Sequence, residues 1–413
     1  MSFEAHPYLR LIDAETHARP VPPLEAPLRI RRMGFFSTNH GADLQALHQD
    51  MAALAGDGPG LDGLARQLSF EREGRRVTWE RHNEFATITW TAPIDDAVTF
   101  PEGIGLELHK GLPMIFATRI DLLAERQIPE RALVGFNRQS LAYSRIFEDA
   151  AEAATDFVRD ADGFTRFEVA IGDSGAHRQG VIVRRLLEIE TYRVLALMGL
   201  PRARELGGVV TGFENRLRRI LKGLAPGGAP EDLHGVLGQL HDLSVEVGQA
   251  VECTSFRFAA TLAYGAVLDE RLARLRERPI SEHTTIQRFT DNRVHPALST
   301  CRAMEKRLAT VTEKVQGAIE LLEARISLSI QNQNKSLLDS LSATARSQFR
   351  LQQTVEGLSI IAISYYAIGL LGYVFQGLHD VLPYPKEIMV ALAVPIVVLV
   401  TYFVMHRIRR RMH

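Results

Sequence analysis

The pattern of hydrophobic and polar positions changes along the chain, from short segments in the first 175 residues to long helical periods after them. Residues 77–80 and 85–91 flank a turn and predict a hairpin that carries Trp79 and Trp90. Helix-like patterns at 43–55 and 121–124 accompany the strands, so we expect residues 1–175 to form an α+β or α/β domain. Short apolar or alternating segments predict five strands, over 28–36, 77–80, 85–91, 114–120 and 164–171, of which the second and third form this hairpin.

Apolar residues recur every three or four positions from about residue 180 onward, which is typical of amphipathic helices. The spacing predicts one or two helices over 180–222 and a further helix over 233–276. Between them, the sequence GLAPGGAP at 223–230 predicts a linker because it is rich in glycine and proline. We therefore expect an antiparallel helical layer over 176–280.

The apolar stripe continues in a segment that predicts a long stalk helix over 281–356. Proline is tolerated in the first turn of a helix, so we expect the continuous helix to begin near Pro296, after a separate or kinked segment. A helix of this length must pack along its side, either on copies of itself in an oligomer or against other helices. We favour an oligomeric, coiled-coil stalk. The amide run QNQN at 331–334 is either a register-fixing layer, a solvated face or a hydrated layer of a pore.

Two segments without a charged residue follow the stalk, at 357–378 and 388–405. At ~1.5 Å per residue, each is long enough to cross a hydrocarbon core of about 30 Å. Arginines precede the first segment and follow the second, which places both chain termini in the cytoplasm by the positive-inside rule. We expect a hairpin of transmembrane helices at 357–378 and 388–406, with a short extracytoplasmic link at 379–387 and a basic cytoplasmic tail at 407–413.

This arrangement predicts a multi-pass protein of the bacterial inner (cytoplasmic) membrane. The expected partners are the lipid bilayer and further copies of the chain, joined through the stalk and the first apolar segment. The 48 Lys+Arg and 49 Asp+Glu residues nearly balance, so the chain lacks the basic excess of a nucleic-acid-binding protein. A hydrophobic fraction of 46% excludes a disordered chain, and two cysteines exclude a disulfide framework.

The first apolar segment carries more small and polar residues than a simple anchor needs: Ser364, Tyr365, Gly369, Gly372 and Gln376. Small residues allow helices to approach closely, and polar residues hydrogen-bond across helices in lipid. We therefore expect these residues either to pack helices or to line a polar path.

A second candidate site combines carboxylates and imidazoles in the N-terminal domain: Glu15, His17, Glu80, His82 and Glu84. Glu15 and His17 form one set, and Glu80, His82 and Glu84 form the other. Within each set the residues are two positions apart, so in an extended chain their side chains project on one side. They are candidates for binding a divalent cation or for acid–base work. Arg19 and Arg81 lie nearby in the sequence and make an ion-pair cluster the alternative. No catalytic or cofactor-binding residue is assigned, because the phosphate-loop, nucleophile-elbow and HExxH patterns are absent.

Four segments resemble the bacterial "domain of unknown function 3422" family of predicted membrane-anchored proteins. They are ETHARP at 15–20, WERHNEF at 79–85, RLLEIETYR at 185–193 and LQQTVEGLS at 351–359. The resemblance covers essentially the whole chain and implies a membrane-anchored architecture without an activity. The overall plan also resembles CorA-type divalent-cation channels. Their Gly-Met-Asn motif is missing, since the corresponding region reads GYVFQG at 372–377.

The sequence thus favours an oligomeric membrane protein whose cytoplasmic domain senses a signal or gates the transmembrane hairpin, with CorA-like ion transport as one form of this function. One alternative is a membrane-anchored scaffold or binding protein without transport. Another is a membrane-tethered, metal-dependent enzyme that uses the Glu/His cluster.

Overall fold

The structure is a computed structural model that describes residues 6, 8–9, 12, 20–39, 41–56, 66–223, 232–377 and 385–412. The strands are β1 (Leu28–Phe36), β2 (Gln67–Arg72), β3 (Arg75–Arg81), β4 (Phe85–Ala92), β5 (Met114–Leu123), β6 (Ala142–Ile146), β7 (Ala151–Thr155), β8 (Thr165–Ala170) and β9 (Arg278–Pro279). The helices are α2 (Ala42–Ala55), η1 (Leu106–His109), α3 (Glu130–Leu133), α4 (Ala176–Leu197), α5 (Gly199–Gly223), α6 (Leu233–Ala273), α7 (Ile286–Gly377) and α8 (Lys386–Met412). Contacts divide the chain into a first unit, Met1–Ala318, and a second unit, Ile319–His413.

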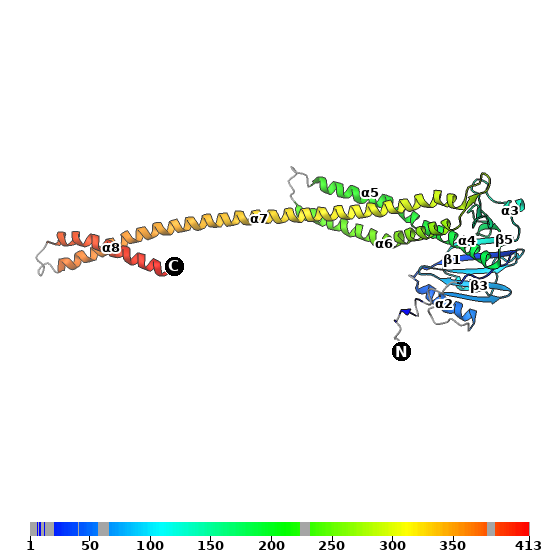
Figure 1. Cartoon of the computed structure of the whole chain (residues 1–413). Helices are drawn as coiled ribbons and strands as arrows, with labels where there is room; N and C mark the ends of the chain where they lie inside the picture. The colour runs from blue at the N-terminus through cyan, green and yellow to red at the C-terminus, as the bar shows by residue number, and fades with distance from the viewer. Residues whose placement is uncertain are drawn as a thin grey trace, which may run out of the picture. The chain divides into compact units, whose positions relative to one another are not determined.

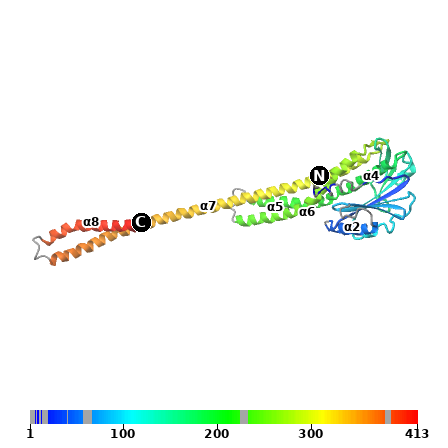
Figure 2. The same cartoon turned by 60° about the horizontal axis from the view of Figure 1, so that its bottom comes forward.

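The first unit is built on a nine-stranded sheet with the order β2-β3-β4-β1-β5-β8-β7-β6-β9. Neighbouring strands are antiparallel except β5 and β8, which are parallel. Helix α2 covers one face of the sheet, and α4 lies on the other (Figure 1, Figure 2). Because side chains alternate along a strand, Met33 and Phe35 of β1 join the core beside α2, whereas Ile30 joins the core beside α4.

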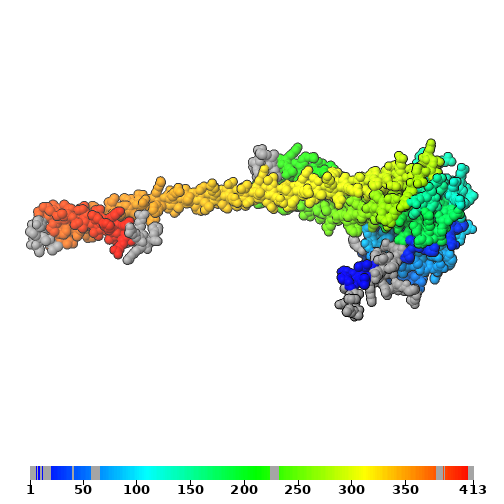
Figure 3. All heavy atoms as spheres, in the orientation of Figure 1, coloured from blue at the N-terminus to red at the C-terminus, as the bar shows by residue number. Residues whose placement is uncertain are grey.

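Each face of the sheet therefore has its own hydrophobic core. Trp79 and Trp90, predicted on one hairpin, are both fully buried beside α2. On the opposite face, α4 and the end of α6 pack on the sheet together with the first turns of α7. In the space-filling view, the green and yellow atoms of these helices cover that side of the blue strands (Figure 3). Burying this apolar surface supplies the main driving force for the fold.

The predicted mixed α/β domain is confirmed in its main elements. Strand β1 occupies the predicted residues, and β3 and β4 form the predicted hairpin. The prediction of a helix-like segment at 121–124 was wrong, because residues 121–123 continue β5. Asp121 interrupts the apolar pattern there, but the guanidinium of Arg29 on the neighbouring strand neutralises its charge, with Nε 2.6 Å from Oδ1. Strands β2, β6 and β7 were not predicted.

The predicted long helices are present. The segment 180–222 corresponds to two helices, α4 and α5, and 233–276 corresponds to α6. Gly199, at the start of α5, lies close to both other long helices. A Cβ added there would lie 2.6 Å from Oγ1 of Thr261 on α6 and 3.2 Å from Sγ of Cys301 on α7. The helices can approach this closely because glycine has no side chain. Residues 224–230 of the predicted linker lie outside the described residues.

Helix α7 begins at Ile286, so the prediction that the continuous helix begins near Pro296 was wrong. A proline inside a helix removes one backbone hydrogen bond and costs roughly 3 kcal/mol. The turns around Pro296 nevertheless remain helical because they are anchored in the core. Ile286, Phe289, Val294 and Leu298 are all buried there, and fully burying one such side chain contributes about 1.5–3 kcal/mol.

The second unit contains the remainder of α7 together with α8. Both helices include a stretch that is long and apolar enough to cross a membrane, and these stretches are almost entirely unburied. A Cβ added at Gly372 of α7 would lie 4.0 Å from Cγ2 of Val390 of α8. The link residues 378–384 lie outside the described residues, so the transmembrane hairpin stays a prediction.

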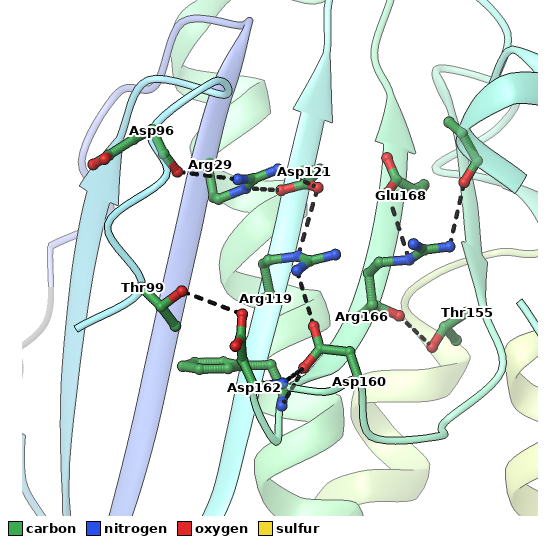
Figure 4. Close-up of polar contacts among 12 residues, drawn as sticks. Arg29, Asp96, Thr99, Arg119, Asp121, Thr155, Asp160, Asp162, Arg166 and Glu168 are labelled. Carbon is green, nitrogen blue, oxygen red and sulfur yellow. Dashed lines mark hydrogen bonds and ion pairs between the residues drawn. The ribbon is translucent and has the colours of Figure 1, made fainter. Parts of the chain in front are cut away.

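A belt of charged side chains crosses the sheet at β1, β5 and β8 (Figure 4). Arg29 binds Asp121, Nη1 of Arg119 lies 2.9 Å from Oδ2 of Asp160, and Nε of Arg166 lies 3.7 Å from Oε1 of Glu168. Burial raises the pKa of Glu168 to about 8, and the nearby Asp121 carboxylate adds to the rise. This burial outweighs the attraction of the surrounding arginines, so Glu168 retains its proton at neutral pH.

The raised pKa of Glu168 predicts a pH-dependent loss of stability. The folded state binds this proton more tightly than the unfolded chain, whose carboxyl titrates near 4.5. The stabilisation is thus complete below pH 4.5 and is lost as the pH rises through 8. Within this window it falls by up to about 1.4 kcal/mol per pH unit.

We expect Glu168→Gln to remove this pH-dependent contribution to the free energy of unfolding, as measured by chemical unfolding of the full chain at pH 5.5 and pH 8.5. Asp173→Asn is the control, because Asp173 is exposed and should leave the pH dependence unchanged. Parallel pH profiles for the wild type and Glu168→Gln would contradict the assignment.

Candidate functional site

A cavity of about 130 Å³ lies between α4 and the strands β1, β3 and β4, and the segment 20–24 contributes to its wall. The volume is close to that of the engineered cavity of about 150 Å³ that accommodates benzene. The cavity therefore has room for a small organic molecule.

The strand periodicity determines which residues reach this cavity. On β3, Arg76, Thr78 and Glu80 line the cavity, whereas Val77 and Trp79 between them are buried in the core beside α2. The same alternation brings two threonines of β4 into the wall. Apolar residues from three different elements complete it: Leu24, Ile30, Val183 and Leu187.

One edge of the cavity depends on a glycine in α4. A Cβ added at Gly180 would lie 2.1 Å from the carbonyl oxygen of Pro22, so only glycine allows the segment 20–24 to approach the helix this closely. Two hydrogen bonds hold the end of this segment and the residues just after it against α4. The backbone N–H of Leu24 donates to the carbonyl of Ala176 at 3.0 Å, and that of Ala26 donates to Oε1 of Gln179 at 3.0 Å.

A buried ion pair joins the strands at the cavity wall. Nη2 of Arg32 donates to Oε2 of Glu80 at 3.0 Å, and the two side chains are only 10% and 11% exposed. Nε of Arg32 also donates to Oγ1 of Thr89, and Oγ1 of Thr87 donates to Glu80. Each charge is therefore compensated within the sheet, as burial requires.

On the helical side, one carboxylate serves three arginines. Glu188 lies 3.0 Å from Arg184, 3.1 Å from Arg185 and 2.8 Å from Arg271, measured between the paired nitrogen and oxygen atoms. The described lining of the cavity contains four arginines, at 32, 76, 184 and 271, but only two glutamates, Glu80 and Glu188. The cavity therefore carries an excess of positive charge.

Two of the predicted Glu/His residues, Glu80 and His82, line this cavity. The ring of His82 stacks on Phe85 with 4.1 Å between centroids. Glu84 lies at the turn of the hairpin, where it pairs with Arg257 and accepts a hydrogen bond of 2.8 Å from the hydroxyl of Tyr264, both on α6. The ionic partners described for Glu80 and Glu84 are thus arginines.

Glu15 and His17 lie outside the described residues, and a divalent-cation site in this Glu/His cluster stays a prediction. Sequence reasoning missed a different group that has the geometry to hold a metal ion. Asp269 of α6 and Asp291 and His295 of α7 place one ligand atom each within 4.8 Å of one another on the surface.

The arginines of the cavity were also missed by sequence reasoning. The signal available for Arg32 was its position inside the strand LRIRRMGFF, where a buried charge requires a partner. On α4, the i,i+4 spacing of Arg184 and Glu188 predicts a stabilising surface ion pair, and the pair is present at 3.0 Å, but this spacing gave no signal that Arg184 lines a cavity.

The residues predicted to pack helices or line a path lie in the second unit. Ser364 is buried, and its hydroxyl has no hydrogen-bond partner among the described residues. Tyr365 is 75% exposed. Gly369 has open space around its Cα, and Gly372 lies beside α8. Gln376, near the end of α7, completes the set, whose role stays a prediction.

The pair Arg32–Glu80 predicts a large loss of stability when either partner is removed. Because the remaining charge would stay buried, we expect Glu80→Gln or Arg32→Met to lower the free energy of unfolding by about 3–5 kcal/mol. The double variant Arg32→Met/Glu80→Met should recover most of this loss, since no buried charge remains.

Chemical unfolding of the full chain measures this prediction. The matched control is Arg202→Met, which breaks the exposed pair between Arg202 and Glu205 and should cost less than about 1 kcal/mol. If Glu80→Gln cost no more than this surface control, the pair would not stabilise the sheet.

Comparison with known proteins gives one family match. The model of the family described as "Protein of unknown function (DUF3422)" matches residues 4–412. No curated protein and no solved structure matches the chain. These comparisons do not support the resemblance to CorA-type channels.

Proposed function

Because the chain belongs to the DUF3422 family, whose description assigns no activity, we propose from its own geometry that it is a membrane-anchored sensor that binds a small organic anion. The observation that carries the proposal is the cavity of about 130 Å³ beside α4, with its apolar wall and its excess of arginine. Ligand sites commonly combine such an apolar lining with a few oriented polar groups.

The arginines differ in their availability to a ligand. Arg32 is committed to Glu80, and Arg184 and Arg271 share Glu188. Arg76 has weaker interactions among the described residues, where its ionic partner is Glu71 at 3.6 Å and the carbonyl oxygen of Pro23 accepts from it at 3.2 Å. We therefore assign Arg76 as the residue that attracts the anionic group, with the apolar body of the ligand against Val183.

Sensing requires that the cavity be coupled to the helix that leads out of the first unit. Val183 and Leu187 line the cavity and share one core with Ile286 and Phe289 of α7. A ligand that changes the packing of this core would change the conformational preference of α7. This shared core favours a sensor over a passive scaffold, which remains the alternative together with a metal-dependent enzyme.

Membrane attachment is supported by the two apolar helical stretches, whose surfaces are almost unburied. The close approach of Gly372 to α8 supports a hairpin of two spans. We propose that both termini lie in the cytoplasm, following the distribution of arginine.

The exposed face of α7 with Leu337, Leu341 and Phe349 favours a second copy of the chain as its partner. Ion conduction stays a prediction for the first apolar segment.

Ligand binding can be tested with benzoate, a planar anion that matches the cavity in size. We expect the full chain in mild detergent to bind benzoate more tightly than the neutral and nearly isosteric benzamide, as measured by isothermal titration calorimetry. Arg76→Met should weaken benzoate binding about tenfold and leave benzamide unchanged, because it removes one charge-assisted contact.

The control for Arg76→Met is Arg202→Met, which lies on α5 outside the cavity and should have no effect. Equal affinities for the two probes, or benzoate binding that persists unchanged in Arg76→Met, would contradict the assignment of an anion site to this cavity.

Topology can be tested with the native cysteines, because Cys253 is exposed and Cys301 is buried. In spheroplasts of a bacterial host that expresses the full chain, an impermeant maleimide should label Cys253 only after the membrane is permeabilised. A cysteine at Glu387, introduced as Glu387→Cys in a Cys253→Ser background, should be labelled from outside. Labelling of Cys253 in intact spheroplasts would overturn the proposed orientation.

A further inference from the structure

A second cleft lies where the turn between β6 and β7 meets α4 and the end of α6. Its volume is about 290 Å³, and none of its lining residues lines the cavity beside α4. The residues that line it are Phe147, Glu148, Arg178, Arg185, Arg274 and Arg276.

The fold brings four arginines together from two parts of the sequence. Arg178 and Arg185 are seven residues apart on α4, which places them on one face of the helix about two turns apart. Arg274 caps the end of α6, and Arg276 follows it. The backbone N–H of Phe147 donates to the carbonyl of Leu275 at 2.7 Å and fixes the turn against these arginines.

The turn itself has an uncommon backbone conformation. Phe147, Glu148 and Asp149 have φ values of 54°, 60° and 67°, so three consecutive residues other than glycine are in the left-handed region. Such a conformation costs roughly 1–2 kcal/mol per residue. It is held by contacts from the arginines, since Nη2 of Arg178 donates to the carbonyl of Phe147 at 3.2 Å and Arg276 pairs with Glu148. Strain of this kind, maintained by surrounding contacts, often marks a ligand site.

Four arginines and one carboxylate, that of Glu148, line the cleft. Outside the lining, Glu188 pairs with Arg185 and Glu270 pairs with Arg274, so the cleft and its immediate partners keep a net positive charge that Arg178 supplies. Burial lowers the pKa of Arg185, and the neighbouring Arg271 and Arg274 lower it further, against the attraction of Glu188. Nε of Arg185 is buried, and it has no hydrogen-bond acceptor within the part of the chain that the structure describes. Arg185 and Arg274 thus repel each other at the cleft, although Glu188 and Glu270 offset part of this repulsion, and a bound anion would relieve the remainder.

We propose that this cleft binds a small molecule that carries two or more phosphate groups. Guanidinium groups present pairs of N–H donors that match phosphate oxygens, and several arginines are needed to match several phosphates. The side chains of Arg274 and Arg276 are 59% and 67% exposed, so an incoming anion can reach them without opening the fold. A soluble phosphorylated metabolite and a phosphorylated lipid headgroup share this chemistry. The site goes beyond the proposed sensor function and does not depend on it.

The test uses the full chain in phosphatidylcholine nanodiscs and pyrophosphate as the probe, measured by isothermal titration calorimetry. We expect pyrophosphate to bind more tightly than sulfate. Arg178→Gln should weaken binding about tenfold, because it removes a cation whose only described hydrogen bond is to a backbone carbonyl. Arg202→Gln, on an exposed arginine outside the cleft, is the matched control and should bind as the wild type does.

A second variant keeps the proposal testable if Arg178→Gln fails to fold. Glu148→Gln removes the one lining carboxylate and releases Arg276, so it should tighten pyrophosphate binding several-fold. Nanodiscs that contain phosphatidylinositol bisphosphate, a lipid with several phosphate groups on its headgroup, distinguish a lipid from a soluble ligand. Weaker pyrophosphate binding in them would indicate a lipid headgroup that competes for the cleft, whereas unchanged binding would indicate a soluble ligand.

Two results would overturn the proposal: no binding of pyrophosphate, or binding that neither Arg178→Gln nor Glu148→Gln changes. Benzoate binding to the cavity beside α4 should be retained in Arg178→Gln, so failure at this cleft is distinguishable from failure of the proposed sensor function.

Discussion

The arginines of β1 impose the constraint on which the sheet depends. This strand lies between β4 and β5 and is covered on both faces, yet it carries Arg29, Arg31 and Arg32. An unpaired buried charge costs several kcal/mol, so other strands of the sheet supply carboxylates to Arg29 and Arg32. Arg31 is also buried, but its Nε and Nη1 have no hydrogen-bond partner among the described residues. Asp121 on β5 pairs with Arg29 on one face, and Glu80 on β3 pairs with Arg32 on the other. A slip of one residue in the strand register would reverse these faces and separate both pairs.

Much of the fold follows from local patterns in the sequence. The apolar runs of β1 and the two tryptophans of the β3–β4 hairpin are strong local signals, and the three- to four-residue period identifies the long helices. Strand β7 was not predicted because its sequence, AEAAT, consists mainly of small residues with little intrinsic strand preference. The first turns of α7, before Pro296, were not predicted for another reason. Their helical form depends on burial of Ile286 and Phe289 against distant residues, which outweighs the local effect of Pro296.

The residues of the candidate sites could likewise be predicted from the sequence only in part. Alternation along an extended segment was enough to predict that Glu80, on β3, and His82, in the turn after it, lie on one side, and both line the cavity. The arginines could not be assigned from sequence, because their role depends on pairings across the fold. Arg276 meets Glu148 across more than a hundred intervening residues, and nothing in either local sequence indicates the other. The charge balance of each site therefore becomes visible only in three dimensions.

The carboxylate of Glu188 has a consequence for the energetics of both sites. It is shared among Arg184 and Arg271, which line the cavity beside α4, and Arg185, which lines the arginine-rich cleft. An anion in the cleft that attracts Arg185 would leave Glu188 to neutralise the other two arginines more completely, which would weaken the positive potential that helps Arg76 to attract an anion to the cavity. The two ligands would then be antagonists. By thermodynamic linkage, each would lower the affinity of the other by the same factor.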